Sequence, residues 1–355
     1  MENHRLPKTE AARVALAAGV GADGRHPLAA IDAAAADRPE LAELPKVAIP
    51  RQVWAARCVT EEKGRVRLGE AAERPPSAER ICSPYDPAAR HSIRHEADWT
   101  GHTVRLTETC GPACAGPHPV INVETTPATT PDDNIAALVH GSLQRRGPLP
   151  SEHLVDKGRT GSHALVDSKQ RCGVTITGPV ADDPSWQARE GGLTKADLQV
   201  GWERKVVTCP AGKESLSWLP HTWRRGGMVR EARFARRDCT PCPLRSRCAR
   251  AKREPRVVSL QAREHFEALR GARKHQGTEA FRASHAARAG IEGTHAQAIS
   301  RCGLRRSRHI GLAKTHLQHV ITAAAINLVR AAEWFAGTPV AKTRISRFDA
   351  LRPAV

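Results

Sequence analysis

Glu292 is a lone acid in a stretch of the chain, residues 285–330, that is otherwise basic, small or apolar. Carboxylate oxygens are the ligands that Mg²⁺ prefers, and guanidinium groups suit the oxygens of a phosphate. Glu292 is therefore a candidate metal ligand on a helix, with an ordinary exposed acid as the alternative. The cations that follow it, candidates for phosphate contact, are Arg301, Arg305, Arg306, Arg308 and Lys314.

Asp156 is a second candidate because it ends the predicted strand EHLVD. Ligands usually bind at the carboxyl ends of strands in an α/β sheet, although a turn or helix-cap aspartate would have the same sequence. Arg288 precedes Glu292 by four residues, so the two side chains share one face of a helix. Arg288 can neutralise a phosphate, orient the carboxylate, or simply form a surface ion pair.

Four of the ten cysteines stand in a pattern that suits a metal. The segment DCTPCPLRSRC spaces Cys239, Cys242 and Cys248 as C-x2-C-x5-C, and Cys209 in VTCPAG follows an earlier predicted strand. The close pair can place two thiolates on a tetrahedral Zn²⁺ ion, and two further thiolates would close the site. The last spacing is not that of a standard zinc ribbon, so reduced free thiols are the second interpretation.

The composition favours a polyanionic partner. Lys and Arg number 55 against 37 Asp and Glu, which gives a formal net charge of +18. Such an excess favours nucleic acid, with a well-solvated basic surface as the ordinary alternative. Aromatic residues are few, so contact with the backbone of double-stranded DNA is preferred to base stacking. The chain lacks a signal-like apolar N-terminus and an apolar run of membrane-spanning length, which predicts a cytoplasmic protein without a membrane partner.

The absence of several catalytic motifs argues against some common enzyme classes. The sequence has no P-loop, no G-x-G-x-x-G after a strand, no G-x-S-x-G and no H-E-x-x-H. These absences argue against a nucleotide-driven motor, a Rossmann enzyme, an α/β-hydrolase and a zincin.

The elements that must position the candidate residues begin with a helical part. Residues 1–80 form this part and are mostly helical by their periodicity. Within them, a short hairpin that turns at Glu62 to Gly64 comes after the helices, and a Pro-rich linker begins near the end. Residues 81–180 read as strands and helices in alternation, which predicts an α/β fold with a mixed sheet and flanking helices. Asp156 falls in this second part.

The second half of the chain divides into three further parts. Residues 181–254 predict a β-rich insertion that contains the cysteines, residues 255–337 return to helices that include Glu292, and residues 338–355 predict a basic flexible tail. The last helix has an apolar stripe that we expect to face the core. The stripe consists of Leu317, Val320, Ile321, Ala324, Leu328, Ala331 and Phe335.

Taken together, these segments resemble the transposases of bacterial insertion sequences that have a DDE catalytic domain. The resemblance spans Asn3 to Gly337, and its combined specificity is high although each motif alone is weak. The segments that carry it, in the family's order, are SPYDPAAR, WTGHTVRLTETC, VETTPATTPDD, EHLVD, TGPVADDPSWQAR, VTCPAGKESLSW, RFARRDCTPCPLRSRC, RAGIEGT and LAKTHLQHVITAAAINLVR.

The resemblance implies an RNase H-like catalytic domain that is interrupted by an insertion before the last catalytic helix. In that family three carboxylates hold two Mg²⁺ ions for DNA cleavage and strand transfer, and the proteins generally act as multimers on paired DNA ends. By matched position, Asp156 resembles the second catalytic aspartate and Glu292 the catalytic glutamate. Arg288 matches the arginine of the family's Tyr-x2-Arg-x3-Glu signature.

Several positions depart from the family's pattern. His285 and Ile299 stand where the signature has tyrosine and lysine, and Lys157 begins Lys-Gly-Arg where a Gly-Tyr pair usually follows the aspartate. The first catalytic aspartate lies, in similar transposases, on an Asp-Ser-Thr strand upstream of the point where this chain begins. We therefore expect an N-terminal truncation. Asp86 is a weak substitute, because its flanking prolines are poor central-strand residues.

These departures lead to the expectation of a transposase remnant that binds DNA by charge and lacks strand-transfer activity. Two other functions remain open at this point. One is a DDE enzyme that works through Asp156, Glu292 and Asp86. The other is a non-catalytic, zinc-stabilised DNA-binding protein built around the cysteines.

Overall fold

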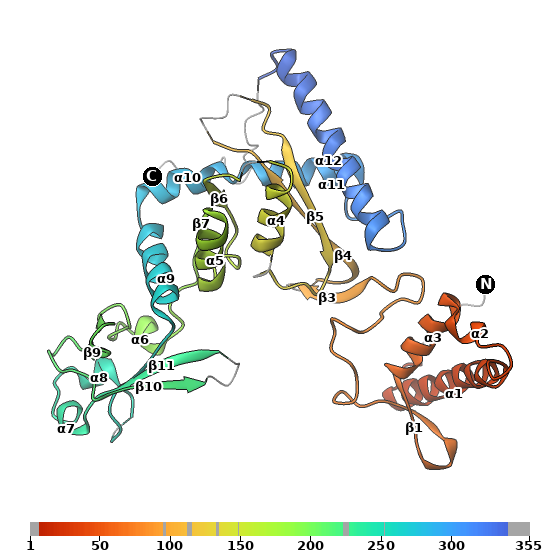
Figure 1. Ribbon diagram of the computed structural model, residues 1–355, viewed down its shortest axis with the longest axis horizontal. Coiled ribbons are helices and arrows are strands. Elements are labelled where there is room, and N and C mark those ends of the chain that lie inside the picture. The colour runs from red at the N-terminus through yellow and green to blue at the C-terminus, as the bar shows by residue number, and fades with distance from the viewer. Residues whose placement is uncertain are drawn as a thin grey trace. The chain divides into compact units, whose positions relative to one another are not determined.

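The computed structural model describes residues 7–94, 97–111, 116–132, 135–147, 149–222, 227–251 and 253–339. Contacts divide the chain into two compact units. The first unit comprises residues 1–109, 115–130 and 294–355, and the second comprises residues 110–114 and 131–293. Most of the predicted tail, residues 340–355, lies outside the described residues. Figure 1 shows the elements in chain order.

The first unit begins with a small helical part, coloured red and orange in Figure 1. It contains α1 (Glu10–Ala34), α2 (Glu40–Glu43), α3 (Pro45–Ala55) and the antiparallel hairpin of β1 (Cys58–Thr60) and β2 (Val66–Leu68), joined by the 3-10 turn η1 (Glu62–Gly64). The predicted hairpin and its turn are confirmed. A Cβ atom on Gly21 of α1 would lie 2.9 Å from Cys58 Sγ, so only glycine allows this approach. Trp54 of α3 donates to the Gly21 carbonyl at 2.7 Å.

A three-stranded antiparallel sheet follows in the same unit. It has the order β3 (Arg90–Arg94), β4 (Ala97–Glu108) and β5 (Val120–Pro127). The inner face of β4 and β5 carries Leu106, Val120 and Val123, all buried. Burial does not simply alternate along these strands, because Arg105, Asn122 and Thr126 are buried as well.

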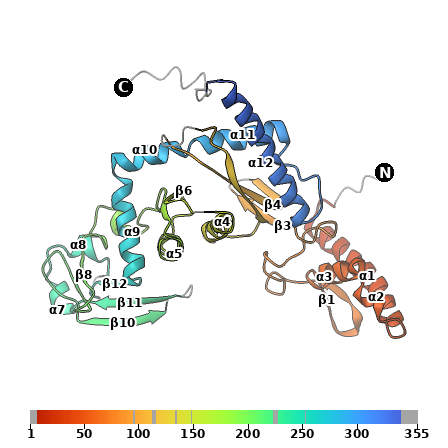
Figure 2. The same cartoon turned by 45° about the horizontal axis from the view of Figure 1, so that its top comes forward.

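Two helices pack on this sheet from the C-terminal end of the chain. They are α11 (Gly290–Cys302), from Thr294 onward, and α12 (Leu312–Phe335), which runs along β5 in both views (Figures 1 and 2). Ala298, Leu304 and Ile326 form a small buried apolar cluster between them.

The anchoring of α12 on the sheet is mainly polar. Asn327 binds both backbone groups of Val120, accepting at 2.7 Å and donating at 2.8 Å. Arg330 donates to Glu108 Oε2 at 3.0 Å and to the carbonyl of His118 at 2.6 Å. These bonds stabilise the β5 end of the sheet because each satisfies a group that burial removes from water.

The prediction that the apolar stripe of α12 faces the core is wrong. The buried residues of the helix are Thr315, His319, Thr322, Ala323 and Ile326. Leu317, Ile321, Leu328 and Phe335, the large members of the predicted stripe, are 58–80% exposed. The polar face is buried because its side chains find partners on the sheet and on neighbouring loops, as the His319 bond to Thr125 Oγ1 at 2.8 Å shows.

The second unit contains a compact α/β element that positions Asp156. The short strands β6 (Glu152–Leu154) and β7 (Thr175–Thr177) pair in parallel. The crossover between them is α5 (Ser162–Cys172), and α4 (Ile135–Gln144) precedes β6. Val155, Ile176, Ala136 and Ala164 form the buried core of this element. The predicted strand, helix, strand order is confirmed here.

The β-rich insertion also lies in the second unit. Its elements are α6 (Trp186–Arg189), the hairpin of β8 (Gln199–Gly201) and β9 (Val206–Thr208), the antiparallel sheet of β10 (Ser217–Thr222), β11 (Met228–Arg233) and β12 (Val257–Leu260), and the short helices α7 (Arg236–Cys239) and α8 (Arg245–Cys248). Figure 2 shows β10, β11 and β12 beside α7 and α8. The core contains Leu198, Val207, Phe234 and Val258, with Trp202 and Trp218 packed edge to face against each other.

The helices α9 (Arg263–Gln276) and α10 (Glu279–Ala287) lead from the insertion to α11. The mixed α/β class is confirmed, but the described strands form five small sheets rather than one mixed sheet. The RNase H-like arrangement implied by the resemblance stays a prediction. No helix in the described ranges has the length and apolar character needed to cross a membrane.

Candidate active site

Asp156 lies immediately beyond the carboxyl end of β6. The backbone N–H of Val155 donates to the Thr177 carbonyl at 2.9 Å and extends the pairing with β7 by one residue. A turn then follows, in which Arg159 N–H donates to the Asp156 carbonyl at 3.1 Å and Gly158 has a φ of +113°. The side chain of Asp156 is 55% exposed, so its carboxylate faces solvent just beyond the strand end.

Glu292 reaches the same place from the first turn of α11. Arg288, the residue that ends α10, has a side chain that is only 16% exposed. Its Nη2 atom donates to Glu292 Oε1 at 3.0 Å and forms a close ion pair with Asp156 Oδ1. One guanidinium group therefore holds together two carboxylates that are 136 positions apart in the sequence.

The positive charge of Arg288 lies between the negative charges of Asp156 and Glu292. Two carboxylates that approach each other repel, and the cation between them removes that repulsion. The contribution to folding stability is small, because both acids are largely exposed and solvent screens such pairs. The group therefore presents two exposed carboxylates that one guanidinium joins.

The buried His140 and the partly buried His153 lie behind β6. His140 Nε2 and His153 Nδ1 lie 3.0 Å apart within one hydrogen bond. Burial first, and then the charges of His140 and Arg159, lower the pKa of His153 to about 4. Burial also lowers the pKa of His140. Both rings are therefore neutral at neutral pH, and the pair ties β6 to α4 rather than supplying charge to the site.

Asp86 belongs to the first unit and holds the backbone there. Its Oδ1 atom accepts from the N–H groups of Ala88 and Ala89 at 3.1 and 3.2 Å. Its Oδ2 atom accepts from Gly311 N–H at 3.1 Å and lies 3.3 Å from His102 Nε2. Burial raises the pKa of Asp86, but the bonds from Gly311 and His102 outweigh that effect and lower it overall. Both oxygens thus have structural partners, which weighs against Asp86 as the substitute catalytic acid.

The five predicted phosphate-contacting cations are all exposed. Arg301 lies in the last turn of α11, Arg305, Arg306 and Arg308 follow in the loop, and Lys314 lies in the first turn of α12. Gln318 fixes the loop backbone by accepting from Arg308 N–H at 2.9 Å and donating to the Arg306 carbonyl at 3.0 Å. None of the ion pairs within the described ranges involves these five side chains, so their charges stay available to an anion.

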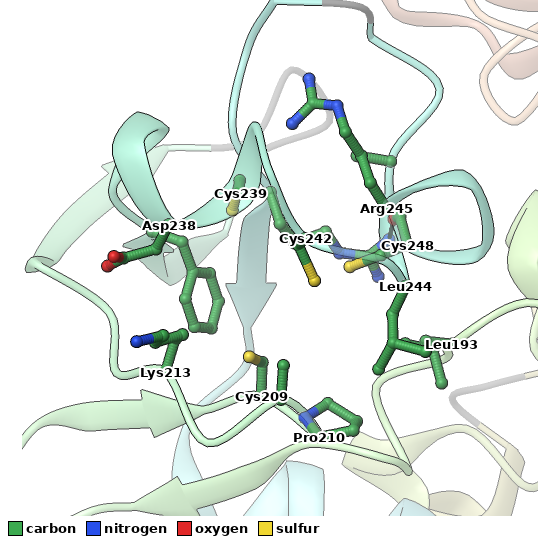
Figure 3. A pocket seen from close by; sticks show the side chains of 14 residues that line it. Leu193, Cys209, Pro210, Lys213, Asp238, Cys239, Cys242, Leu244, Arg245 and Cys248 are labelled. Atoms are coloured by element: carbon green, nitrogen blue, oxygen red, sulfur yellow. Dashed lines mark hydrogen bonds between the residues drawn. The ribbon is translucent and has the colours of Figure 1, made fainter.

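The four predicted metal-ligating cysteines line one cavity of about 30 Å³ in the insertion (Figure 3). Cys209 follows β9, Cys239 and Cys248 end α7 and α8, and Cys242 lies between those helices. All four are free thiols. Burial raises the pKa of the Cys248 thiol, Arg256 opposes that effect, and the other three cysteines add to it. No group of three or more His, Cys, Asp or Glu side chains in the described part of the chain is arranged as a metal site.

Residues 208–332 match the family model for the transposase DDE domain. This part of the chain is a transposase DDE domain. No curated protein and no solved structure matches the chain. The matched range contains Glu292, Arg288, the cysteines and all five exposed cations, whereas Asp156 and Asp86 precede it. The recognition of a DDE-type transposase from the motifs is confirmed.

Two features of the site were not predicted from the sequence. The first is the contact between Arg288 and Asp156, since only the spacing from Arg288 to Glu292 was visible. The second is Gly178, which follows β7 and leaves no room for a side chain, because a Cβ atom there would lie 2.4 Å from the Val155 carbonyl oxygen. A glycine inside the strand predicted over residues 174–180 was the signal that could have drawn attention to it.

Proposed function

We propose that the chain acts on double-stranded DNA as a DDE transposase, with Asp156 and Glu292 as the oxygen ligands of Mg²⁺. The observation that carries the proposal is the meeting of these two carboxylates at Arg288. Mg²⁺ keeps several water molecules and takes substrate phosphate oxygens as further ligands, so two protein carboxylates can suffice to bind it. When bound, the metal would supply charge stabilisation for phosphodiester cleavage and strand transfer.

The roles of the side chains follow from their contacts. Asp156 and Glu292 bind the metal, and Arg288 is a positioning residue that keeps the two carboxylates together when no metal is present. An RNase H-like domain remains part of the proposal, because the family's carboxylates are held in that way. We expect this chain alone to cleave DNA poorly, since no third carboxylate has been assigned and both oxygens of Asp86 already have partners.

Binding of Mn²⁺, a spectroscopic substitute for Mg²⁺, tests the metal site without requiring cleavage. Asp156→Asn and Glu292→Gln should each weaken binding roughly 10-fold or more, since even the loss of an outer-shell partner typically costs 10–100-fold. Asp167→Asn is the matched control, because Asp167 is an exposed acid of α5 with its own ion pair to Arg171. Equal Mn²⁺ affinity in the wild type and both site variants, measured by electron paramagnetic resonance, would refute the metal site. Mg²⁺-dependent nicking or joining of DNA by the wild-type chain would refute the expected low activity.

The salt dependence of DNA binding tests whether the chain contacts double-stranded DNA through its exposed cations. The logarithm of the DNA affinity should fall linearly with the logarithm of the salt concentration, by about 0.9 for each phosphate contacted. Changing Arg305, Arg306 and Arg308 together to alanine should therefore reduce the slope by up to about 3. An affinity that does not respond to salt, or a slope unchanged in the triple variant, would exclude this strip as the DNA contact.

For the oligomeric state, we infer that a second copy of the chain packs on the exposed apolar stripe of α12. Leu317, Ile321 and Leu328 of the stripe are exposed and uncharged, and an apolar stripe of this kind can pack against its own copy across a two-fold axis. Exposed apolar patches of this extent typically mark an interface. Hydrogen bonds to the sheet hold the opposite face in place, so the helix cannot simply rotate to bury the stripe.

Sedimentation of the purified chain tests this interface. We expect a dimer at micromolar concentration, and we expect Ile321→Glu combined with Leu328→Glu to yield monomers because two charges would be buried in the contact. Leu219→Glu, at an exposed apolar residue of β10, is the control and should leave the dimer intact. A monomeric wild-type chain would contradict the inference.

A further inference from the structure

The four cysteines of the insertion are brought together by two separate segments. Cys209 lies in a tight turn, in which its N–H donates to the Lys213 carbonyl at 2.9 Å and its carbonyl accepts from Gly212 N–H at 2.8 Å. Gly212 has a φ of +73°, which this turn requires. On the other side, Cys239, Cys242 and Cys248 follow one another through two successive turns of backbone. The thiols of all four residues border the same cavity (Figure 3).

We propose that Cys209, Cys239, Cys242 and Cys248 bind one Zn²⁺ ion in tetrahedral thiolate coordination. Sulfur ligands and a closed set of four are typical of structural zinc. A cavity of about 30 Å³ has room for a single small ion. The thiols are not yet at coordinating positions. Binding therefore requires the side chains to turn inward, as happens where metal binding and local folding are coupled.

The charges around the cavity suit this ligand set. Four thiolates and one Zn²⁺ ion leave a net charge of −2. The lining contains Lys213, Arg245 and Arg256 but only one acid, Asp238. The surroundings therefore offset the negative charge that the site would acquire.

The segment that the metal would hold has little else to stabilise it. Both α7 and α8 are four residues long, neither has a buried residue, and neither has a side-chain N-cap. A hydrophobic core therefore cannot fix this segment by itself. Zinc would join the turn after β9 to the α7–α8 segment and so position its many arginines, among them Arg236, Arg237 and Arg247. This inference does not depend on the proposed catalytic function.

Metal analysis of the full chain tests the proposal. After refolding with Zn²⁺ and removal of the excess, we expect about one zinc per chain by elemental analysis. Replacement with Co²⁺ should give the visible absorption of tetrahedral cobalt thiolate. Cys239→Ser and Cys242→Ser should each lose most of the bound metal. Cys172→Ser and Cys302→Ser, which change cysteines outside the cavity, should retain it.

A thiol-reactivity measurement on the unmodified chain guards against variants that fail to fold. Four thiols should react with a disulfide reagent slowly until a chelator is added, and then quickly. The proposal would be overturned by a wild-type chain that holds no zinc, by a Cys242→Ser variant that holds as much as the wild type, or by a mass decrease that shows disulfides among the four. Each readout is independent of DNA cleavage, so failure here is distinguishable from failure of the catalytic proposal.

Discussion

Replacing Arg330 with methionine should destabilise the first unit by about 3–5 kcal/mol, the usual cost of leaving a buried partner charge unpaired. Arg330 and its partner Glu108 have side chains that are 18% and 8% exposed, and Nη1 lies 3.0 Å from Oε2. Glu108 also accepts a hydrogen bond from Thr294, and Arg330 donates to that hydroxyl oxygen. The substitution would leave the largely buried Glu108 carboxylate without its cation.

Hydrogen exchange of the β4 and β5 amides measures this effect locally. A loss of about 3–5 kcal/mol corresponds to exchange that is faster by a hundredfold to several thousandfold. Arg38→Met is the control, because Arg38 and its partner Glu40 are both more than 60% exposed, and it should change stability by less than about 1 kcal/mol. Adding Glu108→Gln to Arg330→Met should restore part of the loss, since it removes the unpaired charge. Unchanged exchange in Arg330→Met would show that the pair does not hold α12 on the sheet.

Replacing Gly178 with alanine should disturb Asp156 through the backbone. The new Cβ atom would lie 2.4 Å from the Val155 carbonyl oxygen and 3.0 Å from a methyl group of Thr160, so the strand end has to move. Overpacking of this kind costs about 1–3 kcal/mol. Because Asp156 directly follows Val155, we also expect weaker Mn²⁺ binding than in the wild type. A shift of Asp156 would break its contact with Arg288, although neither residue is changed.

The matched control for Gly178 is another glycine of the second unit. A Cβ atom on Gly271, inside α9, meets no atom within 4 Å. Gly271→Ala should therefore stabilise its helix by about 0.5–1 kcal/mol, opposite in sign to Gly178→Ala. Thermal unfolding together with Mn²⁺ titration of the two variants checks both expectations. A Gly178→Ala protein with wild-type stability and metal affinity would mean that the turn before Asp156 tolerates displacement.

The sequence alone determined the local elements and the candidates they carry. The hairpin around Glu62–Gly64, the strand just before Asp156 and the crossover helix after it were predictable. Such elements depend on neighbouring residues and on apolar spacing. The order of the motifs likewise identified the transposase domain before any geometry was known.

Only the tertiary structure decided which distant residues meet. Arg288 joins Asp156 to Glu292, Cys209 joins a C-x2-C pair more than two dozen residues away, and Asp86 binds the backbone of Gly311. No local pattern encodes such contacts, because they depend on how whole elements pack. The orientation of α12 was decided in the same way. Its apolar periodicity marked a stripe, but hydrogen bonds from Asn327 and Arg330 to the sheet selected the polar face for burial.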